Sequence, residues 1–407
     1  MVVERLPIAP GDDQGTSTMG LPILLILFAT SAAAVVAYGV HADLAQLSSG
    51  LTIIMISRRI MWPMIALSLI LCIALIGLVI SGKRRAWWLI GLAPVLALFV
   101  HRFGPGAPGP TAVVENPPFV GANDADVPEA GDYVVGLMFE DRAYAFPYRA
   151  LFARPVISLV DYDQRMLLLW SAYANRAVAV HLTRELRVRD LEVVASPANA
   201  LVVYNRRLGQ FICGVTGRLL KGGEVVGFGK SIATTKTTWS EWRGAHPDSQ
   251  VMAGWNRSTS LPNRPILPAH KLRVPPIPEP GTQVAVLATT QPAAVRDDVK
   301  LDTPANLTIG ETRVLLMRDR AGRIRAFDRH VKEDLFLTFE LSTKNTSGKR
   351  ELNLVDVDTQ STWTLDGRAI EGQLKGERLR PIDLDDRLFW GVMKFWYPNL
   401  ELIETGG

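Results

Sequence analysis

Apolar residues are concentrated in three runs near the N-terminus, and the few charged residues fall between or beside them. Residues 20–40 contain no charged side chain, and residues 61–80 form a second run of the same kind. A third, shorter run covers residues 86–103 and has Pro94 in its middle. A helix needs about 20 apolar residues to cross a hydrocarbon core of roughly 30 Å. The pattern therefore predicts a region of three transmembrane helices at residues 20–103, preceded by a tail at residues 1–19.

Basic residues beside the runs indicate how the helices are oriented. Lys83, Arg84 and Arg85 fill the short connection between the second and third runs. Loops rich in lysine and arginine stay on the cytoplasmic side of a membrane. The N-terminus is then cytoplasmic and the large C-terminal part lies on the opposite side. Arg58 and Arg59 oppose this assignment because they precede the second run.

Two features of the spans are suited to contacts with the membrane interface or with other helices. Trp87 and Trp88 lie at the start of the third run, where tryptophan anchors a helix at the membrane interface, and they are candidate interface residues. A row of small residues at 31–34 permits close helix approach. Two alternatives remain open for this row, which are packing among the three helices and packing against another subunit.

Beyond residue 103 the pattern changes to short β-branched and aromatic runs separated by Gly and Asn, which predicts a mainly-β domain. Gly and Pro dominate residues 104–118, and prolines recur through 255–282, so both segments are predicted to be linkers. They delimit a first β half at 119–254 and a second at 283–407. A helix is predicted at 238–245 with Thr238 or Thr237 as its cap, and a strand at 335–341.

The two β halves resemble each other. Residues 165–169 (RMLLL) parallel 313–317 (RVLLM), Gly217-Arg218 parallels Gly367-Arg368, and Trp239 parallels Trp390. The order is kept and the offsets stay close to 150 residues. Such self-similarity predicts a duplicated β unit.

Composition and charge argue against several kinds of binding site. The chain has 44 basic and 40 acidic residues, and their interleaving gives no one-sided patch for nucleic acid. Cys72 lies in a span and Cys213 in the β part, so a disulfide between them is not expected. The six histidines lack zinc-site spacing, and no cofactor or metal is assigned. Acidic residues at strand ends, including Asp385 and Asp386, are expected to be solvated.

Motifs between residues 116 and 403 resemble the bacterial domain-of-unknown-function 3179 family. In the first half these are 116–120 (NPPFV), 143–147 (AYAFP) and 239–248 (WSEWRGAHPD); in the second half they include 325–329 (RAFDR) and 337–340 (LTFE). The resemblance implies an exported or membrane-anchored protein. The predicted location is therefore the bacterial cytoplasmic membrane, with the C-terminal domain in the periplasm.

Many members of that family carry a Tyr-Cys-Pro-Leu-Cys-Gly-like motif, which would suit thiol redox chemistry. In this chain the matching stretch is 170–175 (WSAYAN), where Ser171 and Ala174 stand at the two cysteine positions. A serine hydroxyl cannot cycle between thiol and disulfide. The resemblance therefore supports fold and location and counts against a transferred activity.

We expect a non-catalytic accessory subunit that stabilises a larger membrane complex through its helices and its periplasmic domain. Expected partners are lipid and other membrane subunits, for example those of a respiratory or photosynthetic complex. Trp390, Trp396 and Tyr397 form a C-terminal aromatic cluster and are further candidate interface residues. The alternatives are a periplasmic protein that binds a small ligand between the halves, and a divergent redox enzyme.

Overall fold

The structure is a computed structural model that describes most of the chain. The described residues are 20–41, 44, 47, 49–103, 113–124, 127–254, 261–267, 282–289, 291–320, 322–332, 335–346 and 349–403. They belong to two compact units, residues 1–110 and 111–407. The predicted tail at 1–19 and most of the two predicted linkers lie outside the described residues.

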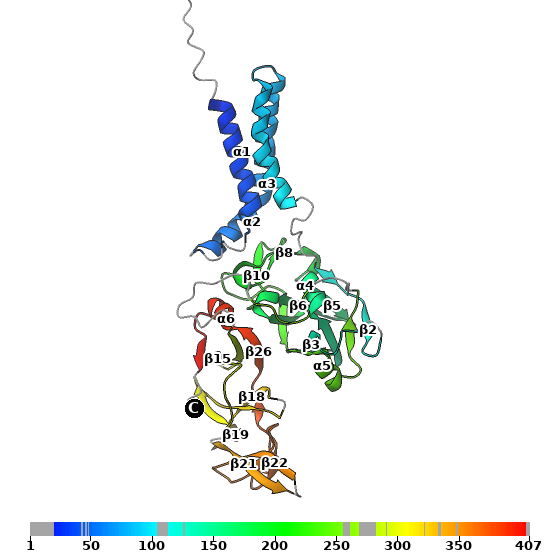
Figure 1. Ribbon diagram of the computed structural model, residues 1–407, viewed down its shortest axis with the longest axis vertical. Coiled ribbons are helices and arrows are strands. Elements are labelled where there is room, and N and C mark those ends of the chain that lie inside the picture. The colour runs from blue at the N-terminus through cyan, green and yellow to red at the C-terminus, as the bar shows by residue number, and fades with distance from the viewer. Residues whose placement is uncertain are drawn as a thin grey trace, which may run out of the picture. The chain divides into compact units, whose positions relative to one another are not determined.

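The first unit contains three helical segments that are long and apolar enough to cross a membrane, which confirms the prediction (Figure 1). They are α1 (Gly20–Tyr38), α2 (Gly50–Ile80), and the 3-10 helix η2 (Ala86–Leu92) continued by α3 (Ala93–Phe103). The second segment begins eleven residues before the predicted start at residue 61. At 1.5 Å per residue, α2 is about 46 Å long and exceeds the hydrocarbon core by about 16 Å. The turn with Arg58 and Arg59 can therefore lie outside that core.

The third segment is divided at Pro94, which lies in the first turn of α3 and not in the middle of one helix. Proline is favoured there because its missing N–H would have no partner in the first turn. A 3-10 helix rises about 2.0 Å per residue, so η2 and α3 together still cover about 30 Å.

The small residues of α1 pack within the unit. Ala29 and Ala33 are buried in a cluster with Val95 of α3, and Leu71 of α2 packs against it. The Ser68 hydroxyl of α2 donates to the backbone oxygen of Ala29 at 3.1 Å. The row at 31–34 therefore serves, at least in part, packing among the three helices.

The first half of the second unit contains thirteen strands and two α-helices within the described residues. The strands are β1 (Val114–Glu115), β2 (Phe119–Gly121), β3 (Tyr133–Phe139), β4 (Arg142–Pro147), β5 (Val156–Asp161), β6 (Gln164–Ser171), β7 (Arg176–Leu182), β8 (Leu191–Ala195), β9 (Val202–Asn205), β10 (Gln210–Cys213), β11 (Phe228–Ile232), β12 (Thr234–Thr238) and β13 (Gln250–Met252). The α-helices are α4 (Tyr148–Ala153) and α5 (Trp239–Ala245), and short 3-10 turns include η3 (Ala172–Ala174), η4 (Val188–Asp190) and η5 (Pro197–Asn199).

The second half contains fourteen strands and one α-helix within the described residues. The strands are β14 (Gln283–Leu287), β15 (Ala293–Arg296), β16 (Ala305–Ile309), β17 (Thr312–Arg318), β18 (Ile324–Asp328), β19 (His330–Lys332), β20 (Leu335–Phe336), β21 (Phe339–Thr346), β22 (Lys349–Asp356), β23 (Thr362–Trp363), β24 (Ala369–Glu371), β25 (Arg380–Pro381), β26 (Leu384–Phe389) and β27 (Glu401–Ile403). The helix is α6 (Trp390–Trp396). The strand predicted at 335–341 is instead two strands, β20 and the start of β21.

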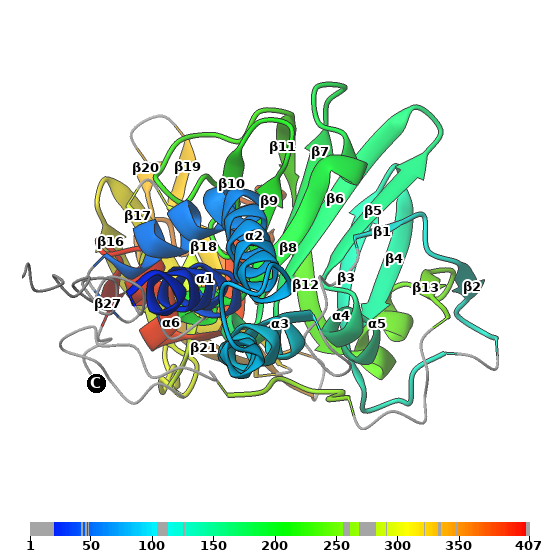
Figure 2. The same cartoon turned by 90° about the horizontal axis from the view of Figure 1, so that it is seen from above.

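Two pairs of sheets have matching strand orders. The order β12-β3-β4-β13 in the first half corresponds to β26-β14-β15-β27 in the second, with the same sequence of antiparallel, antiparallel and parallel pairings. The antiparallel order β5-β6-β7-β11 likewise corresponds to β16-β17-β18-β25, and Figure 2 shows β5, β6 and β7 side by side. This is the arrangement that a duplicated unit would have, and the duplication itself stays a prediction.

The main core of the first half lies between its two five-stranded sheets. Alternate residues of β3, such as Val135 and Leu137, share one buried cluster with Leu168 and Trp170 of β6. The period of two along each strand places these side chains on one face. Helix α5 confirms the predicted helix, and the Thr238 hydroxyl caps it by accepting from the Glu241 N–H at 3.4 Å.

Candidate functional site

A buried ionic cluster lies where β12 of the first half contacts β26 of the second. These strands hold corresponding edge positions in their sheets. The side chain of Lys236 on β12 is 1% exposed, and its Nζ lies 2.5 Å from Oδ1 of Asp385 on β26. The contact between the two halves is therefore centred on a charged pair whose lysine is shielded from water and whose carboxylate is partly buried.

The Lys236 ammonium group has three close oxygen partners. Besides Asp385, Nζ donates to the backbone oxygens of Asn175, at 2.9 Å, and of Asp386. Arg176 also pairs with Asp385, and its Nε donates to the backbone oxygen of Val215 at 3.3 Å. A buried charge is tolerated when it is paired and fully hydrogen-bonded. One carboxylate of the second half thus pairs with two cations of the first.

Asn175 joins the same cluster through its side chain. Its Nδ2 donates to the backbone oxygen of Arg387 at 2.8 Å, and its Oδ1 accepts from the Tyr148 hydroxyl at 2.8 Å. Both Asn175 (φ 50°) and Arg387 (φ 56°) have left-handed backbone conformations. Such conformations cost energy in residues other than glycine and persist where the surroundings enforce them. Asn175 therefore connects the core of the first half to β26.

Burial shifts the ionisation of two groups in the cluster towards neutral pH. It lowers the pKa of Lys236 to about 7, and the negative charge of Asp386 opposes the shift. It raises the pKa of Asp297 to about 6, and repulsion from Asp386 adds to this. An Oδ2 atom of Asp297 accepts from the Arg387 N–H at 3.0 Å. The charge of the cluster therefore changes within the physiological pH range.

Ser171 and Ala174, the two positions that the sequence matches to the cysteine motif, are buried. Ser171 is 1% exposed and Ala174 is fully buried. The Ser171 hydroxyl oxygen accepts from the Leu201 N–H at 3.1 Å, and a Cβ added at Gly214 would lie only 2.9 Å from it. Cys213 is also buried, and burial raises the pKa of its thiol. These atoms serve packing and backbone hydrogen bonding.

The predicted C-terminal aromatic cluster forms an interface within the chain. Trp390 is buried, Trp396 Nε1 donates to the backbone oxygen of Ala198 at 3.1 Å, and the Tyr397 hydroxyl donates to that of Val215 at 3.4 Å. Residues 198 and 215 belong to the first half, so helix α6 contributes to the contact between the halves. A further role of this cluster towards another protein stays a prediction.

The candidate residues of the first unit lie at one end of its helices. Lys83, Arg84 and Arg85 form the connection between α2 and η2. Trp87 and Trp88 follow in η2, with ring centroids 4.1 Å apart in a stacked arrangement, and Trp87 is 52% exposed. Their location at the predicted interface stays a prediction.

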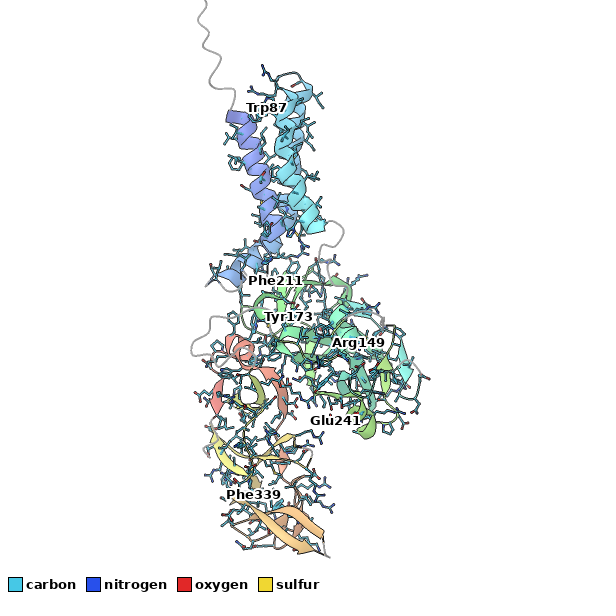
Figure 3. All side chains as sticks on the ribbon, viewed as in Figure 1. Trp87, Arg149, Tyr173, Phe211, Glu241 and Phe339 are labelled. Carbon is cyan, nitrogen blue, oxygen red and sulfur yellow. The ribbon has the colours of Figure 1, made fainter. Side chains whose placement is uncertain are left out.

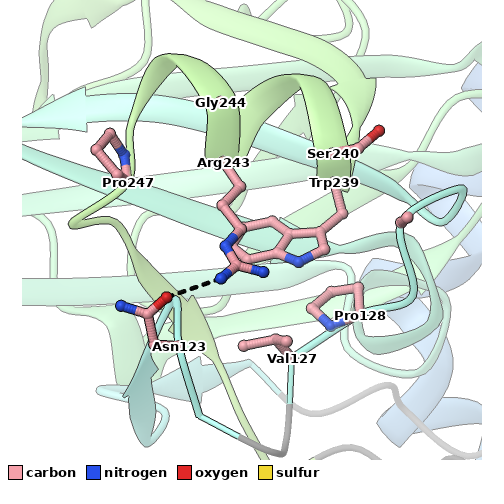
Figure 4. Close-up of a pocket in the computed structure, with 9 residues that line it drawn as sticks. Asn123, Val127, Pro128, Trp239, Ser240, Arg243, Gly244 and Pro247 are labelled. Atoms are coloured by element: carbon pink, nitrogen blue, oxygen red, sulfur yellow. Dashed lines mark hydrogen bonds between the residues drawn. The ribbon is translucent and has the colours of Figure 1, made fainter.

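A pocket of about 550 Å³ lies beside α5 in the first half (Figure 4). Trp239, Val127, Pro128 and Pro247 give it apolar walls, and Arg243 supplies a cation. The lining Asn123 accepts from Arg243 Nη2 at 2.8 Å. This combination suits a small ligand with an apolar part and a negative charge. The expected ligand site between the halves is a different place, where the structure has the ionic cluster.

Sequence reasoning missed most of the ionic cluster. Asp385 and Asp386 were expected to be solvated, but both are partly buried and Asp385 is paired twice. Lys236 carries no local signal, because a lysine in a threonine-rich strand is typical of a solvated edge. The available signal was positional, since the proposed repeat offset of about 150 places residue 236 opposite the acidic residues of β26.

Comparison with known proteins gives one result. A family model described as "Protein of unknown function (DUF3179)" matches residues 112–400. No curated protein and no solved structure matches the chain.

The role of Asn175 can be measured with two substitutions. Asn175→Ala should remove two hydrogen bonds and force alanine into a left-handed conformation, at a cost of about 3 kcal/mol. Asn175→Gly should remove the same bonds without the backbone cost, a loss of about 2 kcal/mol. For a unit of this size these values correspond to roughly 5 °C and 3 °C in the melting temperature, measured by near-UV circular dichroism. Equal melting temperatures for both variants and the wild type would contradict the assignment.

The pH dependence of stability follows from the two shifted pKa values. Asp297 holds its proton more tightly when folded, so the stability that it contributes should fall as pH rises from about 4 to about 6. Lys236 holds its proton less tightly when folded, so stability should rise again from about pH 7 towards 10. The melting temperature is therefore expected to pass through a minimum between these ranges.

Asp297→Asn should remove the fall in melting temperature between about pH 4 and about pH 6. Asp298→Asn is the matched control, because Asp298 is exposed and its hydrogen bond with Arg296 lowers its pKa. A melting temperature that is constant across this range, or the same pH profile in both variants, would show that the cluster does not titrate as described.

Proposed function

The chain belongs to the DUF3179 family of proteins of unknown function, and from this premise we propose that it is a non-catalytic accessory subunit of a larger membrane complex. In this proposal its helices pack beside other membrane subunits. Its β unit, on the periplasmic side of a bacterial cytoplasmic membrane, braces the outer part of the complex. A respiratory or photosynthetic assembly is one such complex.

The observation that carries this proposal is the low burial of the second and third spans. Helix α3 buries only Val95 within the described residues, although one span would be enough to tether a domain. In the most apolar 18 residues of each span, only 6% of the third and 11% of the second are buried. Association of helices in a membrane depends on close packing and not on the hydrophobic effect. Two additional helices with open faces are therefore well suited to contact another subunit.

The buried residues Ser171 and Ala174 support the non-catalytic part of the proposal. Ser171 and Ala174 offer no thiol, so the redox alternative would depend on Cys213. The pKa of that buried thiol is raised, which keeps it protonated and unreactive. The neighbouring residues Asn175 and Arg176 are committed to the contact between the halves.

The test is purification of the native protein from its own membrane in a mild detergent, followed by mass spectrometry. A photo-crosslinking residue at Leu96, which is 65% exposed on α3, identifies what this face contacts. We expect a stoichiometric complex and a crosslink to another membrane subunit. A monomer that crosslinks only to lipid would overturn the proposal.

The ligand-binding alternative is favoured by the pocket beside α5. If that alternative holds, the purified protein should be a monomer whose melting temperature rises with a small anionic ligand. Arg243→Ala should abolish the rise, because it removes the cation that lines the pocket.

The orientation can be measured separately from the function. We expect a membrane-impermeant maleimide to label Tyr162→Cys, at an 83% exposed position of the β unit, in cells with a permeabilised outer membrane. Ser81→Cys, beside the basic loop, should be labelled only after the inner membrane is opened. The reverse pattern would place the β unit in the cytoplasm.

A further inference from the structure

Arginine residues gather on one surface of the β unit, formed by the segment before β8 and the β9–β10 hairpin. Five exposed arginines lie on these two segments, and we call this set the arginine surface: Arg184, Arg187, Arg189, Arg206 and Arg207. Phe211 of β10 marks this end of the β unit in Figure 3, and Phe339 lies at the opposite end.

Hydrogen bonds hold the two segments together. Arg206 Nη2 donates to the backbone oxygen of Arg189 at 2.7 Å, and the Arg206 N–H donates to that of Asp190 at 2.8 Å. Arg207 Nη2 donates to the backbone oxygen of Glu185, and Arg207 Nε lies 3.6 Å from Oδ2 of Asp190. The arginine surface is therefore one continuous patch.

Buried residues fix the first segment to the core. Leu186 and Val188 are 0% and 3% exposed, and they alternate with the exposed Arg187 and Arg189. The Thr183 N–H donates to the backbone oxygen of Gly227 at 2.9 Å. The arginines are thus presented from an ordered backbone, so little entropy would be lost when they bind a partner.

Charge and an exposed apolar residue suit this patch to a lipid surface. The two segments carry five arginines and two acidic residues: Asp190 pairs with Arg207, and Glu185 accepts from the Thr183 hydroxyl. Leu208 is 37% exposed at the tip of the hairpin, directly after two arginines. Cationic side chains beside an exposed apolar residue are typical of surfaces that contact anionic membranes.

The chain length also brings the patch within reach of a membrane. The third membrane span ends at Phe103, and Val113 packs on the hydrophobic cluster that contains Leu186 and Val188. The ten Cα–Cα steps between Phe103 and Val113 extend at most about 36 Å. The chain therefore enters the β unit on the same cluster that supports the arginine surface.

We propose that the arginine surface docks on the headgroups of anionic phospholipids. The guanidinium groups bind lipid phosphates, and Leu208 enters the boundary between headgroups and acyl chains. This interaction is independent of the subunit function proposed above, since it needs only the membrane that holds the helices.

The test uses the full chain in nanodiscs, in a background where both native cysteines are replaced by alanine. A fluorophore on Leu208→Cys reports contact with phospholipids that carry a spin label on the headgroup, which quenches the fluorescence. The same fluorophore on Tyr162→Cys is the reference position. We expect strong quenching at position 208 with phosphatidylglycerol, and weaker quenching with phosphatidylcholine alone or in high salt.

The double substitution Arg187→Gln and Arg189→Gln should lower the ratio of docked to free β unit by about 25-fold, because each arginine contributes about five-fold. Arg368→Gln with Arg378→Gln, two exposed arginines of the second half, is the matched control and should have no effect. An unchanged melting temperature verifies that each variant is folded. Quenching at 208 that is no stronger than at 162, or that is indifferent to lipid charge, would overturn the proposal.

Discussion

The arrangement of the β unit depends on one buried contact between charges, that of Lys236 with Asp385. Neither side chain would be stable in the interior alone, because an unpaired buried charge is very costly. Each half therefore supplies, at the β12–β26 contact, the charge that the other lacks. The additional partners Arg176 and Asn175 surround the same place. Aromatic residues of α6 extend the contact, so the two halves are joined by polar and apolar groups together.

The same contact explains how the segment at residues 170–176 is used. This segment has a buried serine and alanine, Ser171 and Ala174, followed by Asn175 and Arg176. Ser171 and Ala174 pack in the interior, whereas Asn175 and Arg176 contact residues of β26. The segment thus helps to hold the two halves together.

Much of the fold could be predicted from the sequence because hydrophobic periodicity is local. The three spans, helix α5 with its Thr238 cap, and strands such as β3 and β6 all follow from it. The site could not be predicted this way, because Lys236 and Asp385 are about 150 residues apart and meet only through tertiary structure. The arginine surface was hidden for a similar reason, since Arg187 and Arg206 lie in segments that look solvated when taken separately.

A double-mutant cycle between Lys236 and Asp385 tests the central claim most directly. Lys236→Met and Asp385→Asn would be measured singly and together by the melting temperature of the β unit in nanodiscs, at about pH 6, where Lys236 is charged. The account predicts that the double variant is more stable than the sum of the single losses implies, by about 2 kcal/mol or more. Losses that add to within about 0.5 kcal/mol would show that the two groups are not coupled, and that the halves are held together by other contacts.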